Sequence, residues 1–361
     1  MNDKIKEILD MIVNKGFEAY VIGGYPRDYL LGKNSNDYDI CTNAHPDDII
    51  SIFNDVISSN YGSTKVKFKN NIYEITTFRR EGIYIDNRRP SSIEYVNSLI
   101  DDLNRRDFTI NTICMDRNNN IIDLLNGRKD LSNKIIKVVG DPEFKIKEDA
   151  LRILRAIRFA TVLNFKLSND LYLTIKKCGY LVKDLSYERK KNELDKIFAS
   201  EFVMYGINLI KELNLDKYLE LDFSDIKKTS LYGIWAQVNP HNYKFSKIEK
   251  NKINKINELR KLNVLNNYNL YKYGLSISII VGKINNISEE LIRNKYNSLP
   301  IKNIKDIKID LKKINIKEKK NIIFDIEKKI LSSELINNSE EILKYIKKHI
   351  KLYVHKINRN N

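Results

Sequence analysis

Cysteine is scarce in this sequence, and long apolar runs are missing from it. The three cysteines, Cys41, Cys114 and Cys178, are odd in number and scattered, which fits neither a disulfide framework nor the ligand spacing of a zinc site. No stretch approaches the ~20 apolar residues of a membrane-spanning helix, and residues 1–10 are charged, unlike the apolar core of a signal peptide. We therefore expect a reduced, cytoplasmic protein with no membrane partner.

Acidic residues are outnumbered by basic ones. The 361 residues include 63 Lys and Arg against 47 Asp and Glu, which gives a formal net charge of +16 and a pI of about 9.4. This surplus favours a polyanionic partner, nucleic acid before membrane. Much of it is Lys interleaved with Tyr, Asn and Ile, so a merely basic surface is the alternative.

Hydrophobic periodicity divides the chain near residue 140. Before that point, short apolar runs separated by turns predict one helix over 4–14 and strands over 19–22, 37–41, 65–69 and 73–78. After the turn Gly140-Asp141-Pro142 the spacing becomes helical, beginning with a predicted helix over 146–163, and it stays helical to the end. The predicted fold class is α+β, with a mixed head followed by helices.

Asp37 and Asp39 form the first candidate site. In an extended segment, residues two apart point to the same face, so both carboxylates project together while Tyr38 and Ile40 turn toward the core. Such a pair suits two Mg²⁺ ions, roughly 3.5–4 Å apart, that clamp the attacking and leaving oxygens of a nucleotidyl transfer. A solvated Asp pair at a strand end is the alternative.

A glycine pair, Gly23-Gly24, precedes this segment and opens a predicted helix. Glycines let the backbone approach a triphosphate closely, and Arg27 in the first turn adds a bidentate cation. Pro26 is compatible with a first helical turn because its missing N–H would be unpaired there. An ordinary strand-to-helix connection is the alternative.

The segment 105–111 combines cations, a carboxylate and an amide. Asp107 and Asn111 lie four residues apart at a helix start, where they can bind ribose hydroxyls, and Arg106 can reach a phosphate. An N-terminal capping arrangement with incidental arginines is the alternative.

The segment 147–159 carries a polar stripe along a predicted helix. Asp149 and Arg152, one turn apart, can meet a base edge together. A carboxylate accepts from the exocyclic amine of cytosine or adenine and a guanidinium donates to the ring acceptor beside it, so the pair accepts C and A and rejects U and G. Arg155 and Arg158 remain for phosphates or primer backbone. An i, i+3 ion pair on a solvated helix is the alternative.

Together these segments resemble the class II tRNA nucleotidyltransferases, the bacterial CCA-adding enzymes, and their relatives the bacterial poly(A) polymerases. The matching pieces follow the family order: GGYPRD, DYDI, IYEITTFR, EGIYIDNRRP, RRDFTIN, EDALRILRAIRFA and YERKKNEL. They cover about the first 200 residues. The later helices match only in general character.

The resemblance implies a polymerase-beta-like nucleotidyltransferase head followed by an all-α neck, body and tail. On this pattern the catalytic head spans 1–140, the base-recognising neck 141–200, and the tRNA-binding body and tail 201–300 and 301–361. The matching family residues bind magnesium at Asp37 and Asp39. Those that contact the incoming nucleotide correspond to Gly24, Arg27 and Arg106, and those of the protein template and its pocket to Asp149, Arg152, Arg155 and Arg158.

Two further features bear on catalysis. Glu74 lies on a strand that can neighbour the Asp pair and is the candidate third carboxylate, with a surface role as the alternative. The polar loop over 81–90 can reposition the template residues between C and A addition. Family members that stop after CC have a shortened loop here, so this complete loop favours CCA or A addition.

The expected function is addition of CCA to the 3′ end of tRNA from CTP and ATP, with Mg²⁺ as the metal. An A-adding enzyme and a poly(A) polymerase are the close alternatives. A catalytically silent RNA-binding protein and a nucleotidyltransferase for a small molecule are the alternatives from other classes. No histidine is followed by Asp, which argues against an attached phosphohydrolase module. The sequence gives no indication of oligomeric state.

Overall fold

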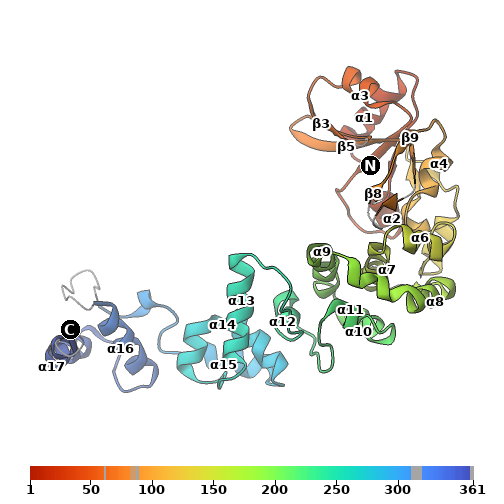
Figure 1. The fold of residues 1–361 in the computed structure, drawn as a ribbon. Helices are drawn as coiled ribbons and strands as arrows, with labels where there is room; N and C mark the ends of the chain where they lie inside the picture. The colour runs from red at the N-terminus through yellow and green to blue at the C-terminus, as the bar shows by residue number, and fades with distance from the viewer. Residues whose placement is uncertain (61, 83, 86–88, 310–318, 358–361) are drawn as a thin grey trace. The chain divides into compact units, whose positions relative to one another are not determined.

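The computed structural model describes residues 1–60, 62–82, 84–85, 89–309 and 319–357. The chain forms two compact units, residues 1–221 and 222–361 (Figure 1). The role predicted for the loop over 81–90 lies largely outside the described residues, because 83 and 86–88 are not among them.

The first helix, α1 (Asp3–Val13), lies where the periodicity predicts one. The Asn2 side chain caps it by accepting a hydrogen bond from the N–H of Ile5 at 3.0 Å. Four apolar residues at helical spacing make one buried stripe, which packs against the sheet: Ile5, Ile8, Leu9 and Ile12.

A seven-stranded sheet forms the centre of the head, in the order β11-β10-β1-β2-β5-β4-β3. Strands β2 and β5 run parallel, and the other neighbours run antiparallel. The predicted strands correspond to β1, β2, β4 and β5, although β2 begins at Asp39 and leaves Asp37 just before it. The strands are β1 (Ala19–Ile22), β2 (Asp39–Thr42), β3 (Val56–Asn60), β4 (Ser63–Phe68), β5 (Asn71–Thr77), β10 (Cys114–Met115) and β11 (Ile121–Ile122).

Shorter elements complete the head. They are α2 (Gly24–Leu30), α3 (Pro46–Ile52), β6 (Arg79–Glu81), β7 (Tyr84–Ile85), β8 (Arg89–Pro90), β9 (Ile93–Tyr95), α4 (Leu99–Asn104), η1 (Thr109–Asn111), α5 (Gly127–Ser132) and β12 (Ile135–Ile136).

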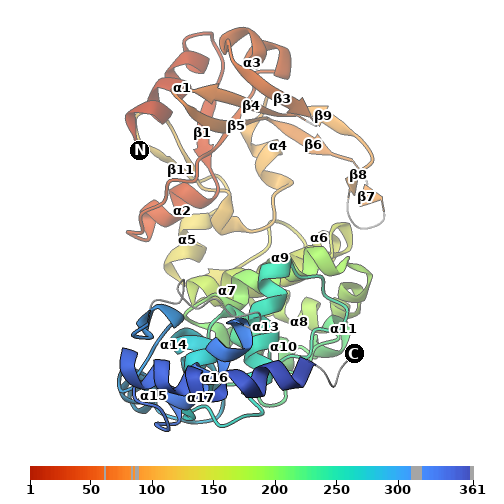
Figure 2. The ribbon, with the colours of Figure 1, turned by 90° about the vertical axis from the view of Figure 1, so that its left-hand side faces the viewer.

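The sheet is covered on both faces because its central strands alternate between two apolar clusters. Ile40 and Ile75 pack with α1 and α3 on one face, and Cys41 and Phe78 pack with α4 on the other (Figure 2). This alternation fixes the register of β2 and therefore the direction in which its first residue, Asp39, points.

The rest of the first unit is helical except for β13 (Lys166–Leu167), which pairs with β12. Helix α7 packs against both α9 and α10. The predicted body begins inside this unit, because residues 201–221 belong to it. The helices are α6 (Pro142–Glu148), α7 (Leu151–Leu163), α8 (Asn169–Cys178), η2 (Gly179–Asp184), α9 (Tyr187–Phe198), α10 (Val203–Glu212) and α11 (Asp216–Leu219).

The continuous helix predicted over 146–163 is wrong at one point. Helix α6 ends at Glu148 and α7 begins at Leu151, because Asp149 has the extended backbone angles φ −143° and ψ 106°. Its side chain accepts a hydrogen bond from the N–H of Leu151 at 3.0 Å, which offers the backbone an alternative to the helix. The break places Asp149 between two helices and off the polar stripe of α7.

The regular elements in the described residues of the second unit are all helices. It contains α12 (Leu231–Trp235), α13 (Lys247–Leu259), α14 (Asn267–Ile284), α15 (Glu289–Asn297), η3 (Ile304–Asp306), α16 (Lys319–Leu331) and α17 (Ser339–Ile357).

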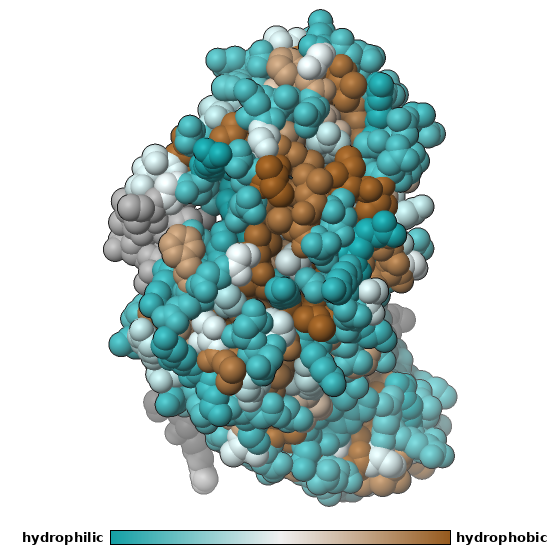
Figure 3. All heavy atoms as spheres, turned by 90° about the vertical axis from the view of Figure 1, so that its right-hand side faces the viewer, coloured by the Kyte–Doolittle hydropathy of each residue, from teal (hydrophilic) through white to brown (hydrophobic). Residues whose placement is uncertain are grey.

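Figure 3 shows one face on which hydrophilic residues dominate and hydrophobic ones gather in a patch in the upper half of the view. Among the described residues, no helix combines the length and apolarity needed to cross a membrane.

Gly206 tests the packing that supports α7. A Cβ at this position in α10 would lie 2.3 Å from Oγ1 of Thr161 and 2.9 Å from Cγ2 of Ile197. Gly206→Ala should lower the free energy of unfolding by about 1–3 kcal/mol, because overpacking outweighs the gain in helix propensity. Urea unfolding measures this change. Lys196→Ala, on the exposed side of α9, is the control and should have little effect; equal stability of the two variants would contradict the packing argument.

Candidate active site

One cleft in the first unit collects most of the predicted site residues. Its volume is about 570 Å³. Every predicted site residue except Glu74 is among its lining residues, although they come from segments far apart in the sequence. The lining consists of Gly23, Gly24, Arg27, Asp37, Asp39, Glu81, Arg105, Arg106, Asp107, Asn111, Asp149, Arg152, Arg155, Arg158 and Phe159.

Asp37 and Asp39 both reach this cleft, whereas Tyr38 between them packs against the core. The Tyr38 ring lies 4.3 Å from the ring of Tyr25. Desolvation and the neighbouring charge of Asp37 raise the pKa of Asp39, and Arg106 only partly opposes the rise. Two carboxylates held together with incomplete compensation by protein cations are a donor set that fits hard divalent cations.

Gly23 brings the backbone close to this pair. Its φ of +83° is in the region that favours glycine, and a Cβ there would lie 3.5 Å from Oδ2 of Asp39. A side chain at Gly23 would therefore be strained and would crowd the carboxylate.

Glu74 lies directly beside Asp39 in the parallel pair β2–β5. It lines a neighbouring cleft of about 590 Å³, which also reaches Asp37 and Asp39, and its carboxylate accepts a hydrogen bond from Ser63. Within the described part of the chain, no three carboxylate, imidazole or thiol groups are arranged to hold a metal ion. The third-carboxylate role of Glu74 therefore stays a prediction.

Arg27 projects from α2 into the cleft and is held there by two neighbours. Its Nη1 donates to Oδ1 of Asn111 at 2.8 Å, and its Nη2 lies 2.8 Å from Oδ1 of Asp28. Its guanidinium also lies 5.3 Å from the centre of the Phe159 ring. The arginine is therefore oriented before any anion arrives.

Asp102, which the sequence reasoning missed, holds two arginines of the cleft. It is fully buried on α4 and accepts from Nε of Arg105 at 2.9 Å and from Nη2 of Arg106 at 2.9 Å. Burial opposes ionisation of this carboxyl, but Arg106 and Arg105 outweigh it and lower the pKa of Asp102. Its spacing from the two arginines, three and four residues on a helix, was the available signal.

Asp107 and Asn111 contact each other in the cleft, and each also holds an arginine. Nδ2 of Asn111 donates to Oδ1 of Asp107 at 3.1 Å, and Nε of Arg155 donates to Oδ2 of Asp107 at 2.7 Å. Burial works against the charge of Asp107, yet Arg155 lowers its pKa. Asp107 is thus an ionised anchor for Arg155.

Asp149 and Arg152 both reach the cleft but do not pair with each other. Nη2 of Arg189 donates to Oδ1 and Oδ2 of Asp149 at 2.9 and 2.8 Å. Arg152 instead pairs with Glu148 and donates to the carbonyl of Lys145 at 2.6 Å. The i, i+3 ion pair offered as an alternative is wrong, because the helix break at Asp149 turns that carboxylate toward α9.

Phe159 is a second residue of the site that the sequence reasoning missed. The guanidinium of Arg158 lies 4.1 Å from its ring centre, and those of Arg27 and Arg155 lie 5.3 and 5.5 Å away. Three cations around one aromatic ring are partly stabilised by its quadrupole. Nε of Arg158 also lies 3.0 Å from Oε2 of Glu193 on α9.

The charge of the cleft is close to balanced. It is lined by six arginines (Arg27, Arg105, Arg106, Arg152, Arg155 and Arg158) and five carboxylates (Asp37, Asp39, Glu81, Asp107 and Asp149). The arginines suit a triphosphate, and the Asp pair suits the divalent cations that accompany one.

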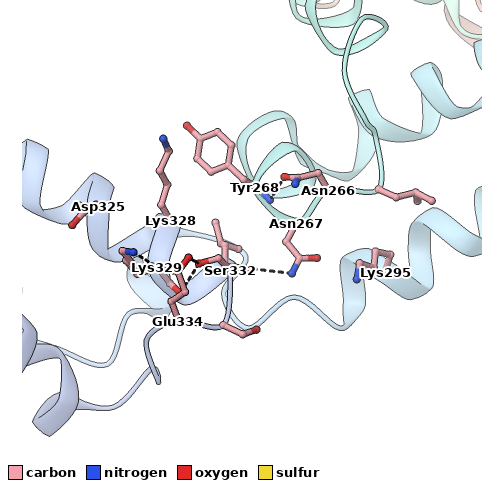
Figure 4. A pocket seen from close by; sticks show the side chains of 12 residues that line it. Asn266, Asn267, Tyr268, Lys295, Asp325, Lys328, Lys329, Ser332 and Glu334 are labelled. Carbon is pink, nitrogen blue, oxygen red and sulfur yellow. Dashed lines mark hydrogen bonds and ion pairs between the residues drawn. The ribbon is translucent and has the colours of Figure 1, made fainter.

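A larger pocket in the second unit lacks this chemistry. It measures about 730 Å³ and lies between the start of α14 and the end of α16 (Figure 4). Its two acidic side chains do not form a pair of free ligands, because Glu334 bonds Lys329 and Asp325 bonds Tyr345. The catalytic chemistry therefore points to the cleft of the first unit.

Comparisons with known proteins agree with this site. Residues 19–137 match the family described as the poly A polymerase head domain, and residues 164–224 match the probable RNA and SrmB-binding site of polymerase A. The fold and cleft thus define a nucleotidyltransferase that acts on RNA. The CCA-adding enzyme of Staphylococcus haemolyticus is 36% identical over 395 residues, covering 97% of this chain and 98% of that protein. The chain therefore belongs to the CCA-adding enzymes, a family of tRNA nucleotidyltransferases.

Solved structures are similar over the same length. The Bacillus stearothermophilus CCA-adding enzyme in complex with CTP matches with a TM-score of 0.80 and 27% identity, covering 100% of both chains. The Thermotoga maritima CCA-adding enzyme complexed with tRNA matches with a TM-score of 0.70 and 19% identity, covering 97% of this chain and 96% of that one. Because the sequence identity to the Thermotoga maritima enzyme is only 19%, that match shows a similarity of fold alone.

The raised pKa of Asp39 gives a direct test of the carboxylate pair. In metal-free protein, Asp37→Asn should lower the pKa of Asp39, because the neighbouring charge is removed. Carbon-13 NMR titration of the Asp39 side chain measures this shift. Asp47→Asn, an exposed carboxylate on α3, should leave it unchanged. An Asp39 titration that ignores Asp37→Asn would show that the two carboxylates are not coupled.

Proposed function

We propose that this protein adds CCA to the 3′ end of tRNA from CTP and ATP, without a nucleic-acid template, and releases pyrophosphate. The observation that carries the proposal is one cleft that combines the Asp37 and Asp39 pair with six arginines and the Asp149 carboxylate. The Asp pair suits the metal ions of the transfer, and the arginines suit the triphosphate. The Asp149 carboxylate suits a base with an exocyclic amine.

Asp37 and Asp39 would hold the metal, which we propose to be Mg²⁺. Two such ions supply a lowered pKa for the attacking 3′ hydroxyl and charge stabilisation for the departing pyrophosphate. The arrangement fits this use because desolvation and the charge of Asp37 raise the pKa of Asp39, and Arg106 offsets the rise only in part.

The chain's own residues bind and orient the nucleotide. Arg27 and Arg106 donate to the triphosphate and neutralise charge that develops during transfer, while Gly24 lets the backbone approach it. Asp107 and Asn111 lie where they can meet the ribose while they hold Arg155 and Arg27 in place.

The remaining residues select the base. Asp149 accepts from the exocyclic amine of cytosine or adenine, and Arg152 donates to the ring acceptor. Arg155 and Arg158 complete the pocket. For Arg152 to reach a base it must exchange its present contacts with Glu148 and Lys145, so nucleotide binding involves a local rearrangement.

The other parts of the proposal concern the partner and the setting. The helical body and tail, 201–300 and 301–361, bind tRNA, and the head and neck, 1–140 and 141–200, carry out catalysis and base recognition. The three free cysteines are buried, which supports the cytoplasmic setting.

Poly(A) polymerase is the second candidate, favoured by the description of the head family that residues 19–137 match. An A-adding tRNA nucleotidyltransferase uses the same machinery. A silent RNA-binding protein is disfavoured because carboxylates at an RNA site repel phosphates unless a metal neutralises them.

Extension of a tRNA that lacks CCA distinguishes these functions. With Mg²⁺, CTP and ATP, products resolved to one nucleotide should show additions of C, C and A and then stop. Addition of A only after a supplied CC would indicate an A-adding enzyme, and a long A tail a poly(A) polymerase. Asp37→Ala should reduce incorporation about a thousandfold or more, since metal stabilisation is worth several kcal/mol, while tRNA binding persists. Wild-type rates in this variant would contradict the metal assignment.

Glu74 can be tested by its metal dependence. If it is a third carboxylate, Glu74→Gln should raise the Mg²⁺ concentration needed for half-maximal incorporation by roughly tenfold or more, as loss of a supporting group at a metal site does. The control is Ser63→Ala, which removes the hydrogen bond to Glu74 but keeps its carboxylate. Unchanged Mg²⁺ dependence in Glu74→Gln would assign Glu74 to the surface.

A further inference from the structure

Helix α9 carries two charged side chains that pair with residues of the cleft, although neither side chain lines the cleft itself. Arg189 and Glu193 are four residues apart and so lie on one face of the helix. Each pairs with a cleft residue of opposite charge: Arg189 with Asp149 at 2.8 Å, and Glu193 with Arg158 at 3.0 Å. Helix α9 packs beside α7, which carries three of the six cleft arginines, Arg152, Arg155 and Arg158 (Figure 1).

The Asp149 side chain depends on Arg189 because few local hydrogen bonds hold it in place. It lies at the break between α6 and α7, where its local side-chain contact is the N–H of Leu151 at 3.0 Å. Arg189 adds bonds to both carboxylate oxygens, and each of the two side chains has less than a fifth of its surface exposed. Arg189 is thus the cation that orients Asp149.

The Asp149 carboxylate has an acceptor site left over, so it can still accept a hydrogen bond from a base. A carboxylate offers about four acceptor sites. In Asp149, Oδ1 accepts from Leu151 and Arg189, and Oδ2 accepts from Arg189. Oδ2 therefore retains capacity for one more donor, such as an exocyclic amine. A carbonyl of uracil or guanine at that place would face a fixed anion and no proton.

We propose that Arg189 is a positioning residue that fixes the carboxylate of Asp149 as an acceptor and so sets the preference for bases that carry an exocyclic amine. This inference rests on the proposed function, in which Asp149 meets the base. Arg189 acts through Asp149 and does not itself touch the nucleotide.

Without Arg189, arginines of the cleft itself can take its place as partners of Asp149. Arg152 is one turn away in sequence, and the charge of Asp149 already acts on Arg155. Pairing of Asp149 with either arginine would occupy two nucleotide-binding groups at once. The loss should therefore fall on base selection more than on triphosphate binding.

The test measures single-nucleotide incorporation with CTP and with UTP on tRNA that lacks CCA. Arg189→Met should reduce the ratio of kcat/KM for CTP to that for UTP by about 10-fold to 100-fold, the scale expected when a catalytic or binding group is misplaced. Arg189→Lys keeps the charge but loses the fork of donors, so its ratio should lie between those of Arg189→Met and wild type.

The matched control is Lys191→Met on the same helix. It removes the ion pair of Lys191 with Asp195 and leaves Asp149 untouched, so its CTP to UTP ratio should equal that of wild type. Thermal unfolding of each variant accompanies the kinetics. If Arg189→Met does not fold, Arg189→Lys carries the test.

Two outcomes would overturn the inference. One is a wild-type ratio in a folded Arg189 variant, and the other is an equal fall of kcat/KM for both nucleotides, which is what a merely structural role produces. Either result leaves the proposed function intact as long as wild type adds C, C and A. Failure of wild type to do so would instead remove the proposed function.

Discussion

Compensation of buried charge is the constraint on which this site depends. Asp102 has no exposed surface, and it is stable as an anion because Arg105 and Arg106 bond to it. Asp107 is paired with Arg155 in the same way. Removing one partner of such a pair typically costs about 3–5 kcal/mol, because the other charge is left buried alone. Arg105, Arg106 and Arg155 are therefore held in place by the fold, and nucleotide binding does not have to order these three.

The same pairing explains why so many cations can share one small cleft. Six arginines would repel one another strongly, but each of them is paired with a carboxylate, and Phe159 lies among three of their guanidiniums. Asp39 is the exception, since desolvation and the charge of Asp37 raise its pKa and Arg106 offsets the rise only in part. The cleft thus contains one place that attracts cations beside a surface that attracts phosphates, which is the division that a metal-assisted nucleotidyl transfer requires.

Much of the site was predictable from the sequence because its groups are local. The alternation of Asp37, Tyr38, Asp39 and Ile40 is a property of any extended segment, and the structure agrees with it, because Tyr38 and Ile40 pack in the core while Asp37 and Asp39 line the cleft. The glycine pair before α2 and the arginines of α7 were identified by spacing in the same way. The order of these motifs along the chain matched that of a known family, and the chain proved to belong to that family.

The partners of these groups were not predictable. Asp149 was predicted to lie on one continuous helix, a turn away from Arg152, but its side chain competes with the helix for a backbone N–H and turns to Arg189, 40 residues later. Asp102 and Glu193 were missed because a buried carboxylate is recognised only once its cations are placed around it. The sequence by itself determined which residues carry charge and which strand or helix face presents them, since local periodicity encodes both. Only the tertiary structure decided which charges pair, because ion pairing depends on distances between elements that packing sets.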